Sequence, residues 1–279
     1  MEFFSSYSGP DFLAFYGVML VTCIIAGLWV PANLRPVGRP SDVHEMEEAA
    51  VLAGGKKRHV AAVLADLTAR DALVSPRANK LSVRRTEIET GSAGRTLLRK
   101  VADFDFKEAR QSIEADAEAI EGDLVRRGLL MTEGENFMLR LYSITPYLSL
   151  FLLGLYRQQA GAAEGEPTGF LVVLLALTAA LALLRFLVHN PRTKEGVAAM
   201  RELEATATPT RRAPTAAQAG MSVAVFGTGV LVGTPWEPVH SMRQAGDGGF
   251  AGVGGGGGDG SSDAGGSGCG GGGCGGCGG

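Results

Sequence analysis

Three stretches of the chain are apolar enough to be interpreted as helices that cross a membrane. Residues 12–30 carry no charge, and residues 169–188 form a second clear span with Arg185 near one end. About 20 apolar residues are needed, because a helix rises about 1.5 Å per residue and the hydrocarbon layer is about 30 Å thick. Residues 141–156 are shorter and include polar side chains, so a buried helix of a soluble domain is the alternative there. Their position twelve residues before the strong span favours a helical hairpin.

The first span is predicted to be a retained anchor and not a cleaved signal peptide. A signal peptide has a positive region before its apolar run and small residues at its cleavage site. Here the only charges before Phe12 are Glu2 and Asp11, both acidic, and the run ends in Trp29-Val30-Pro31.

The basic residues are distributed unevenly between the segments that the spans separate. Residues 31–140 hold 18 of the 26 Lys and Arg, whereas the connector 157–168 holds one. Basic residues near a membrane are enriched on the cytoplasmic side. We therefore expect residues 1–11 and 157–168 outside, and residues 31–140 and 189–245 in the cytoplasm.

Between the first two spans, the apolar spacing predicts a folded domain over residues 31–140. A first helix is expected to end at Gly54-Gly55, and a second helix to end at Arg70. A turn at Ser75-Pro76 and a short alternating stretch over residues 80–83 follow. Helix, tight turn and two-stranded wing, in this order, are typical of a winged helix.

The pattern recurs 57 residues later in the same segment. Residues 120–131 align with residues 63–74, and residues 136–139 complete the second copy. We therefore predict a duplicated winged-helix-like domain.

Winged helices often bind DNA, but the charge of this segment argues against a nucleic-acid partner. Residues 31–140 contain 18 basic and 18 acidic residues, whereas DNA binding needs surplus cations to neutralise phosphates. The clusters Lys56-Lys57-Arg58 and Arg84-Arg85 are interpreted as a solvated face or a contact with anionic lipids. An unknown cytoplasmic protein is the partner that this balance favours.

A further apolar run covers residues 221–234. Fourteen residues are too few to cross a membrane, and three glycines weaken a helix there. We expect a segment that lies at the membrane interface. The alternative is a fourth span, which would place the C-terminal tail outside.

The sequence offers no recognisable catalytic constellation. His44 begins a metalloprotease-like helix, but Glu48 stands where the second histidine of a zinc pair should be. Residues 54–57 lack the spacing of a phosphate-binding loop, and residues 227–229 lack the third glycine of a dinucleotide fingerprint. We therefore predict no catalytic residue, no cofactor and a non-enzymatic role.

The C-terminal tail, residues 246–279, holds 21 of the 41 glycines. Such a segment cannot bury enough surface to offset its ordering entropy, so we predict that it is disordered. Cys269, Cys274 and Cys277 are spaced C-x4-C-x2-C and are the candidate metal ligands. Structural zinc takes four ligands and the tail offers three thiols, so reduced, metal-free cysteines are the main expectation. Metal capture, lipidation and self-association by crosslinking between chains remain as alternatives.

In its layout the chain resembles a family of uncharacterised bacterial multi-pass membrane proteins. The resemblance rests on the residues 63–74 and 124–131, on Arg192-Thr193-Lys194-Glu195-Gly196 after the last span, and on the glycine- and cysteine-rich residues 268–279. It implies an N-terminal anchor, a winged-helix-like cytoplasmic segment, a helical hairpin and a bacterial inner-membrane location. It implies no activity and no catalytic residues.

The sequence thus predicts a mainly α-helical membrane protein with three transmembrane helices, a cytoplasmic duplicated winged-helix-like α+β domain and a disordered tail. We expect a multi-pass protein of the bacterial inner membrane that contacts membrane lipids and presents an interaction domain to the cytoplasm. A membrane-anchored winged-helix DNA sensor, or a thiol- or metal-handling protein that acts through its tail, is the rival interpretation.

Overall fold

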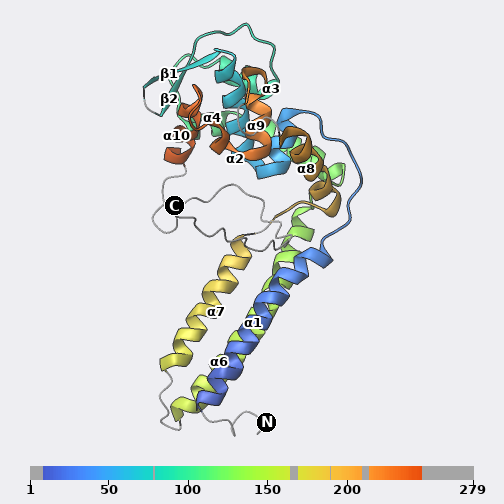
Figure 1. The fold of residues 1–279 in the computed structure, drawn as a ribbon, viewed down its shortest axis with the longest axis vertical. Helices are drawn as coiled ribbons and strands as arrows, with labels where there is room; N and C mark the ends of the chain where they lie inside the picture. Colours follow the sequence, from blue (N-terminus) through green and yellow to red (C-terminus); the bar gives the residue numbers. More distant parts are fainter. Residues whose placement is uncertain (1–8, 78, 164–168, 189, 209–213, 247–279) are drawn as a thin grey trace, which may run out of the picture.

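The computed structural model describes residues 9–77, 79–163, 169–188, 190–208 and 214–246. The described chain is mainly helical and divides into two parts (Figure 1). Three long apolar helices form an elongated bundle. The remaining helices and one β-hairpin form a compact part at one end of the bundle, which we call the head domain.

The bundle consists of α1 (Gly9–Leu34), α6 (Glu133–Ala163) and α7 (Gly169–Leu187). Each of these helices is long and apolar enough to cross a membrane, and they coincide with the three predicted spans. The helix α6 is longer than the predicted span 141–156. It begins with the polar residues Glu133 and Glu135, whose helix is continuous with the apolar stretch.

Close contacts between tyrosines and glycines hold the bundle helices together. Tyr16 of α1 is fully buried, and its hydroxyl lies 3.0 Å from the Thr178 hydroxyl of α7. An added Cβ on Gly154 of α6 would lie 2.8 Å from the Tyr16 ring, so only glycine fits there. Gly27 of α1 packs in the same way against Tyr147 of α6.

The head domain is built from elements that precede and follow the α6–α7 hairpin. The elements before it are α2 (Met46–Ala69), β1 (Leu73–Arg77), β2 (Lys80–Val83), α3 (Ser92–Leu98), α4 (Phe106–Ser112) and α5 (Glu114–Arg126). Those after it are α8 (Lys194–Ala207), η2 (Ala216–Gln218), α9 (Ala219–Phe226), η3 (Thr228–Leu231) and α10 (Glu237–Gly246).

The helix α2 runs through the centre of the head domain, and its second half is buried on all sides. Leu64 and Leu67 are fully buried there. The helix kinks at Gly54-Gly55, where Gly55 has a φ of +64° that a side chain would strain. The apolar helix α9 covers α2 on one side.

The run 221–234 therefore belongs to the core of the head domain, and its prediction as an interfacial membrane segment is wrong. Val223 and Leu231 are fully buried in the cluster that surrounds α2. Apolar composition does not distinguish a segment that enters a membrane interface from one that fills a protein core. Among the described residues, only three helices are long and apolar enough to span.

Of the two predicted wings, only the first forms a β-hairpin in the described residues. The strands β1 and β2 pair as an antiparallel hairpin after α2, and Leu81 pairs in addition with Phe104. Residues 136–139, predicted as part of a second wing, lie instead within α6. In place of a second hairpin, Leu130 forms an isolated antiparallel bridge with Arg192, which comes from beyond the membrane hairpin.

The domain boundaries also differ from the prediction. Residues 189–245 were expected to be a separate juxtamembrane segment, but α8, α9 and α10 contribute Met200, Val223 and Val239 to buried positions in the head domain. The head domain consequently comprises residues 35–131 together with 190–246. The predicted domain 31–140 is incomplete without the second segment.

Candidate functional site

The three connections between the bundle and the head domain meet at one place, which we call the junction. It consists of residues 36–38 after α1, 128–131 before α6 and 191–196 after α7. The Met131 amide donates to the Pro191 carbonyl at 2.8 Å, and the Thr193 amide to the Leu129 carbonyl at 3.0 Å. The amide of Lys194 donates to the Pro36 carbonyl at 2.9 Å.

Thr193 is the central side chain of the junction. It caps α8, because its hydroxyl accepts from the Gly196 amide at 3.1 Å, and it lies 2.7 Å from the Gly128 carbonyl, to which it donates. Gly38 and Gly128 have φ values of +82° and +78°. A Cβ on Gly38 would clash with the Gly128 carbonyl and with Thr193. The two glycines thus allow the three segments to pack at backbone distance.

Two arginines tie the junction to α2. The Arg192 Nε donates to the Leu52 carbonyl at 2.7 Å, and its Nη2 donates to Ala53, so it satisfies carbonyls left open by the kink of α2. Arg127 forms an ion pair with Glu48 at 2.8 Å and donates to the Ser41 hydroxyl. The hydrogen bond to Glu48 is the main reason that the pKa of Arg127 is raised.

The motif residues 124–131 and 192–196, which carry the family resemblance, are therefore brought together by the fold. Their side chains are satisfied by backbone carbonyls, a cap and an ion pair. This arrangement is mechanical: it fixes the head domain to all three bundle helices. In the described part of the chain the polar side chains of the junction are thus engaged in structural contacts.

A buried polar cluster lies inside the head domain. His59 is fully buried, and its Nε2 lies 3.0 Å from the Glu47 carboxylate. On the same helix Asp66 pairs with Arg70 at 2.9 Å. Burial raises the pKa of Asp66, although the neighbouring Arg70 opposes this shift. His59 and Asp66 belong to the buried core, whereas the Arg70 side chain reaches the surface.

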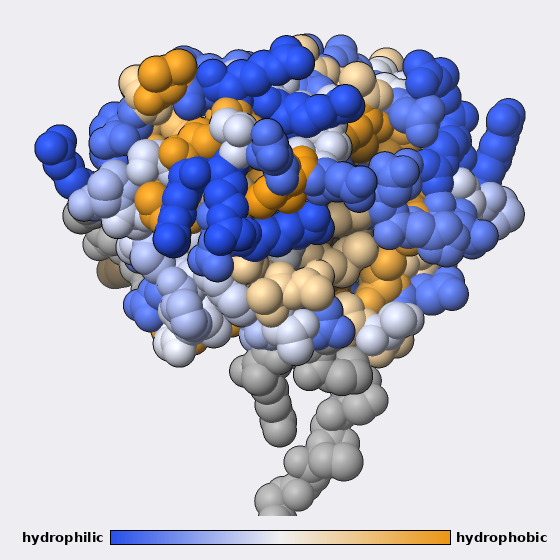
Figure 2. All heavy atoms as spheres, turned by 90° about the horizontal axis from the view of Figure 1, so that it is seen from above, coloured by the Kyte–Doolittle hydropathy of each residue, from blue (hydrophilic) through white to orange (hydrophobic). Residues whose placement is uncertain are grey.

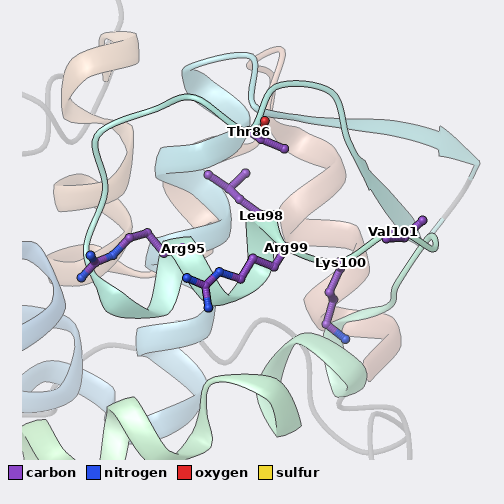
Figure 3. A pocket seen from close by; sticks show the side chains of 6 residues that line it. All are labelled: Thr86, Arg95, Leu98, Arg99, Lys100 and Val101. Carbon is purple, nitrogen blue, oxygen red and sulfur yellow. The ribbon is translucent and has the colours of Figure 1, made fainter.

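The candidate binding site is an open pocket on the face of the head domain that is farthest from the bundle. It has a volume of about 350 Å³ and is lined by Thr86, Arg95, Leu98, Arg99, Lys100 and Val101 (Figure 3). The face is seen from above in Figure 2, where hydrophilic side chains alternate with small hydrophobic areas. We call this site the distal pocket.

The short helix α3 explains the chemistry of the distal pocket. Leu97 and Ala93 point into the core and are fully buried, which leaves Arg95 and Arg99 one turn apart on the outer face. The Lys100 ammonium lies 5.4 Å from the centre of the Phe104 ring. Three cations are thereby held around one opening.

The predicted metal ligands Cys269, Cys274 and Cys277 lie outside the described residues. In the described part of the chain, no group of three or more His, Cys, Asp or Glu side chains could hold a metal ion. Cys23, the cysteine that is described, is buried in the bundle, and its thiol donates to the Pro146 carbonyl at 3.3 Å.

Sequence reasoning missed the distal pocket, although one signal was present. Arg95 and Arg99 are four residues apart, which places them on one face of any helix that contains both. The neighbouring Arg84-Arg85 pair drew attention because its residues are adjacent. Adjacent residues on a helix or strand point in different directions, so spacing was the better signal.

In comparisons with known proteins, no family model, no curated protein and no solved structure matches this chain. The site is therefore interpreted from its own geometry.

Proposed function

We propose that this protein is a non-enzymatic, multi-pass protein of the bacterial inner membrane that presents a protein-interaction domain to the cytoplasm. The observation that carries the proposal is the combination of a fixed junction and an open distal pocket. All three bundle helices connect to the head domain through hydrogen-bonded segments, and the cationic pocket faces away from the bundle. Such an arrangement holds a binding face at a set distance from the membrane.

The orientation in this proposal rests on charge. The head-domain end of the bundle is flanked by Arg35, Arg39, Arg140 and Arg192, whereas the other end has Asp11 and one basic residue, Arg157. By the positive-inside tendency, the head domain is on the cytoplasmic side. Aromatic residues near both ends of the bundle, Trp29 and Tyr156 among them, are exposed and suit contact with lipid headgroups.

Protein is a better partner than nucleic acid for this domain. A nucleic-acid face needs many phosphate contacts, and non-specific DNA binding comes mainly from surplus cations. The head domain, residues 35–131 and 190–246, holds 23 basic and 20 acidic residues, so most of its cations are matched by acids. The pocket lining contains no aromatic side chain on which a base could stack.

Photo-crosslinking in cells tests the proposed function. A photoreactive residue would be placed singly at the exposed positions Thr86, Glu121 and Ala198 of the head domain, and at lipid-facing Leu152 as the control. We expect discrete protein adducts from at least one head-domain position and none from Leu152. Absence of protein adducts at all three positions, or adducts with DNA, would contradict the proposal.

A further inference from the structure

We propose that the distal pocket binds an acidic polypeptide segment through Arg95, Arg99 and Lys100. This inference rests on the proposed function, because it names the chemistry of the protein that the head domain would bind. It concerns one face only, so it can fail while the proposed function stands.

The first argument is the uncompensated charge around the pocket. Arg95 lies in the last turn of α3 and Arg99 is its C-cap, so the two like charges lie one turn apart and repel each other. Neither of them nor Lys100 forms an ion pair with another side chain in the described part of the chain. Residues 84–101 contain five basic and two acidic residues, so the surroundings do not neutralise the cluster. An acidic ligand would relieve this repulsion.

The second argument is the geometry of the donors. The side chains of Arg95 in α3 and of Arg99, its C-cap, run toward the same side of the close-up (Figure 3), and both residues are exposed. Guanidinium groups bind carboxylates through two parallel hydrogen bonds, which makes them more selective than isolated ammonium groups. Two such groups at helical spacing suit carboxylates that are themselves spaced along a peptide.

The third argument is the apolar surface beside the cations. Val101 has a relative exposure of 103%, at the tip of the loop that follows α3. Leu98 also lines the pocket but is only 5% exposed, so Val101 supplies most of the exposed apolar surface. A peptide with an aliphatic residue next to its acidic ones would cover this surface, whereas an inorganic anion would leave it in water. The pocket thus fits a polypeptide better than a small ion.

The position of the pocket excludes the membrane as its ligand. The pocket lies at the end of the head domain opposite to the bundle, so the lipid headgroups that surround the bundle cannot reach it (Figure 1). The anionic partner must come from the aqueous phase.

The test measures binding of a fluorescent peptide of alternating Glu and Leu to the full-length protein in nanodiscs of zwitterionic lipid. The variant Arg95→Glu/Arg99→Glu inverts the pocket. The matched control is Arg77→Glu/Lys107→Glu, which makes the same charge change at two exposed cations that do not line the pocket. We expect the unmodified protein to bind with an affinity that falls as salt is added. We expect a loss of at least about tenfold in the pocket variant and less than about twofold in the control, because charge-assisted hydrogen bonds are lost only in the former.

Three results would overturn the inference. Equal losses in both double variants would mean that diffuse charge, and not the pocket, attracts the peptide. The inference would also be overturned if the unmodified protein bound no peptide measurably, or if it bound duplex DNA as tightly as the peptide. Thermal melting of both double variants checks that the fold is retained. We expect unchanged melting temperatures, because the exchanged side chains are exposed. Crosslinks at Glu121 or Ala198 with none at Thr86 would leave the proposed function standing and remove the distal pocket as the contact.

Discussion

At the scale of single residues, Arg185 has a structural role that its place at the edge of a span does not reveal. Pro31 lies inside α1 and has no N–H, so the carbonyl of Gly27, four residues earlier, loses its normal helical donor. The Arg185 Nε of α7 donates to this carbonyl at 2.9 Å. A charged side chain at the membrane edge thus satisfies a backbone group that a proline has exposed.

Replacement of Arg185 by Leu should destabilise the bundle by about 1–3 kcal/mol, because the Gly27 carbonyl is left without a donor. The double variant Arg185→Leu/Pro31→Ala regains the backbone N–H and should recover part of this loss. The measurement is unfolding of the purified protein in mixed detergent, with the single variant Pro31→Ala completing the cycle. Additive effects of the two substitutions would contradict the role assigned to Arg185.

The raised pKa of Asp66 predicts how the stability of the head domain depends on pH. Burial raises its pKa above the unfolded value, so ionisation of this carboxyl opposes folding. The protonated carboxyl of Asp66 therefore contributes most to the free energy of unfolding at a pH below its pKa in the unfolded chain. This contribution is lost as the pH rises through the higher pKa of the folded state. Asp66→Asn cannot ionise, so its stability relative to the unmodified protein should increase over this acidic interval and then level off. The free energy of unfolding can be measured by denaturation followed through the fluorescence of the partly buried Trp236, with Trp29 replaced by Phe. A difference in stability between the two proteins that stays constant at all pH values would exclude the effect.

At the scale of elements, the kink of α2 depends on one glycine for its backbone and on Arg192 for its open carbonyls. Gly55 has a φ of +64°, and an added Cβ would meet nothing within 4 Å. The kink lets the first half of α2 end where Arg192 can reach Leu52 and Ala53. The direction of α2 and the attachment of the third connection are thus set together.

Gly55→Ala should destabilise the head domain by about 1 kcal/mol or more, because alanine is strained at a positive φ. A steric clash does not contribute, since the added Cβ has room. Gly122 in α5 is the matched control, since it is helical and an added Cβ meets nothing within 4 Å. Gly122→Ala should stabilise by about 0.5–1 kcal/mol. Chemical denaturation of both variants gives the comparison, and equal signs for the two substitutions would refute the strain argument.

The sequence predicts elements well where one local pattern decides them and poorly where two environments share a pattern. The three spans follow from length and apolarity, and the strand over residues 80–83 from its alternating pattern. The turn predicted at Ser75-Pro76 is wrong, because both residues lie in β1 and the chain turns between Arg77 and Lys80. Residues 136–139 were misassigned because a short apolar stretch fits both a strand and the start of a long helix. Residues 221–234 were misassigned because burial against α2 depends on tertiary contacts. The junction was beyond prediction for the same reason, since its three segments are distant in sequence.

At the scale of the whole molecule, the head domain is a single unit made from two separated parts of the chain. Residues 131 and 191 are hydrogen-bonded neighbours, although the entire α6–α7 hairpin lies between them. The hairpin is therefore an insertion that leaves and re-enters the domain at one point.

A fragment of residues 31–140 should not fold cooperatively, because it lacks α9 and exposes the side of α2 that α9 covers. A chain that joins residues 35–131 to residues 190–246 by a short Gly/Ser linker should fold, since the joined ends are adjacent. Circular dichroism melting distinguishes the two outcomes. A cooperative transition in the shorter fragment would show that the C-terminal helices are dispensable.

Because the C-terminal helices belong to the head domain, the tail should begin on the same side of the membrane as the head domain. Val239 of α10 is buried in the head-domain core, so the tail leaves from the head domain. In intact cells a membrane-impermeant maleimide should fail to label Cys269, Cys274 and Cys277, and labelling should appear after permeabilisation. Labelling in intact cells would place the head domain outside and reverse the proposed orientation.

The split construction of the head domain has a consequence for how the protein is made. A chain emerges from the ribosome N-terminus first, so α2 is complete long before α9 has been synthesised. In the interval both later bundle helices must be translated and inserted. Until then α2 keeps an uncovered apolar side of the kind that chaperones and proteases recognise in incompletely folded chains. We therefore expect the head domain to be completed only after the segment that follows the hairpin has been synthesised.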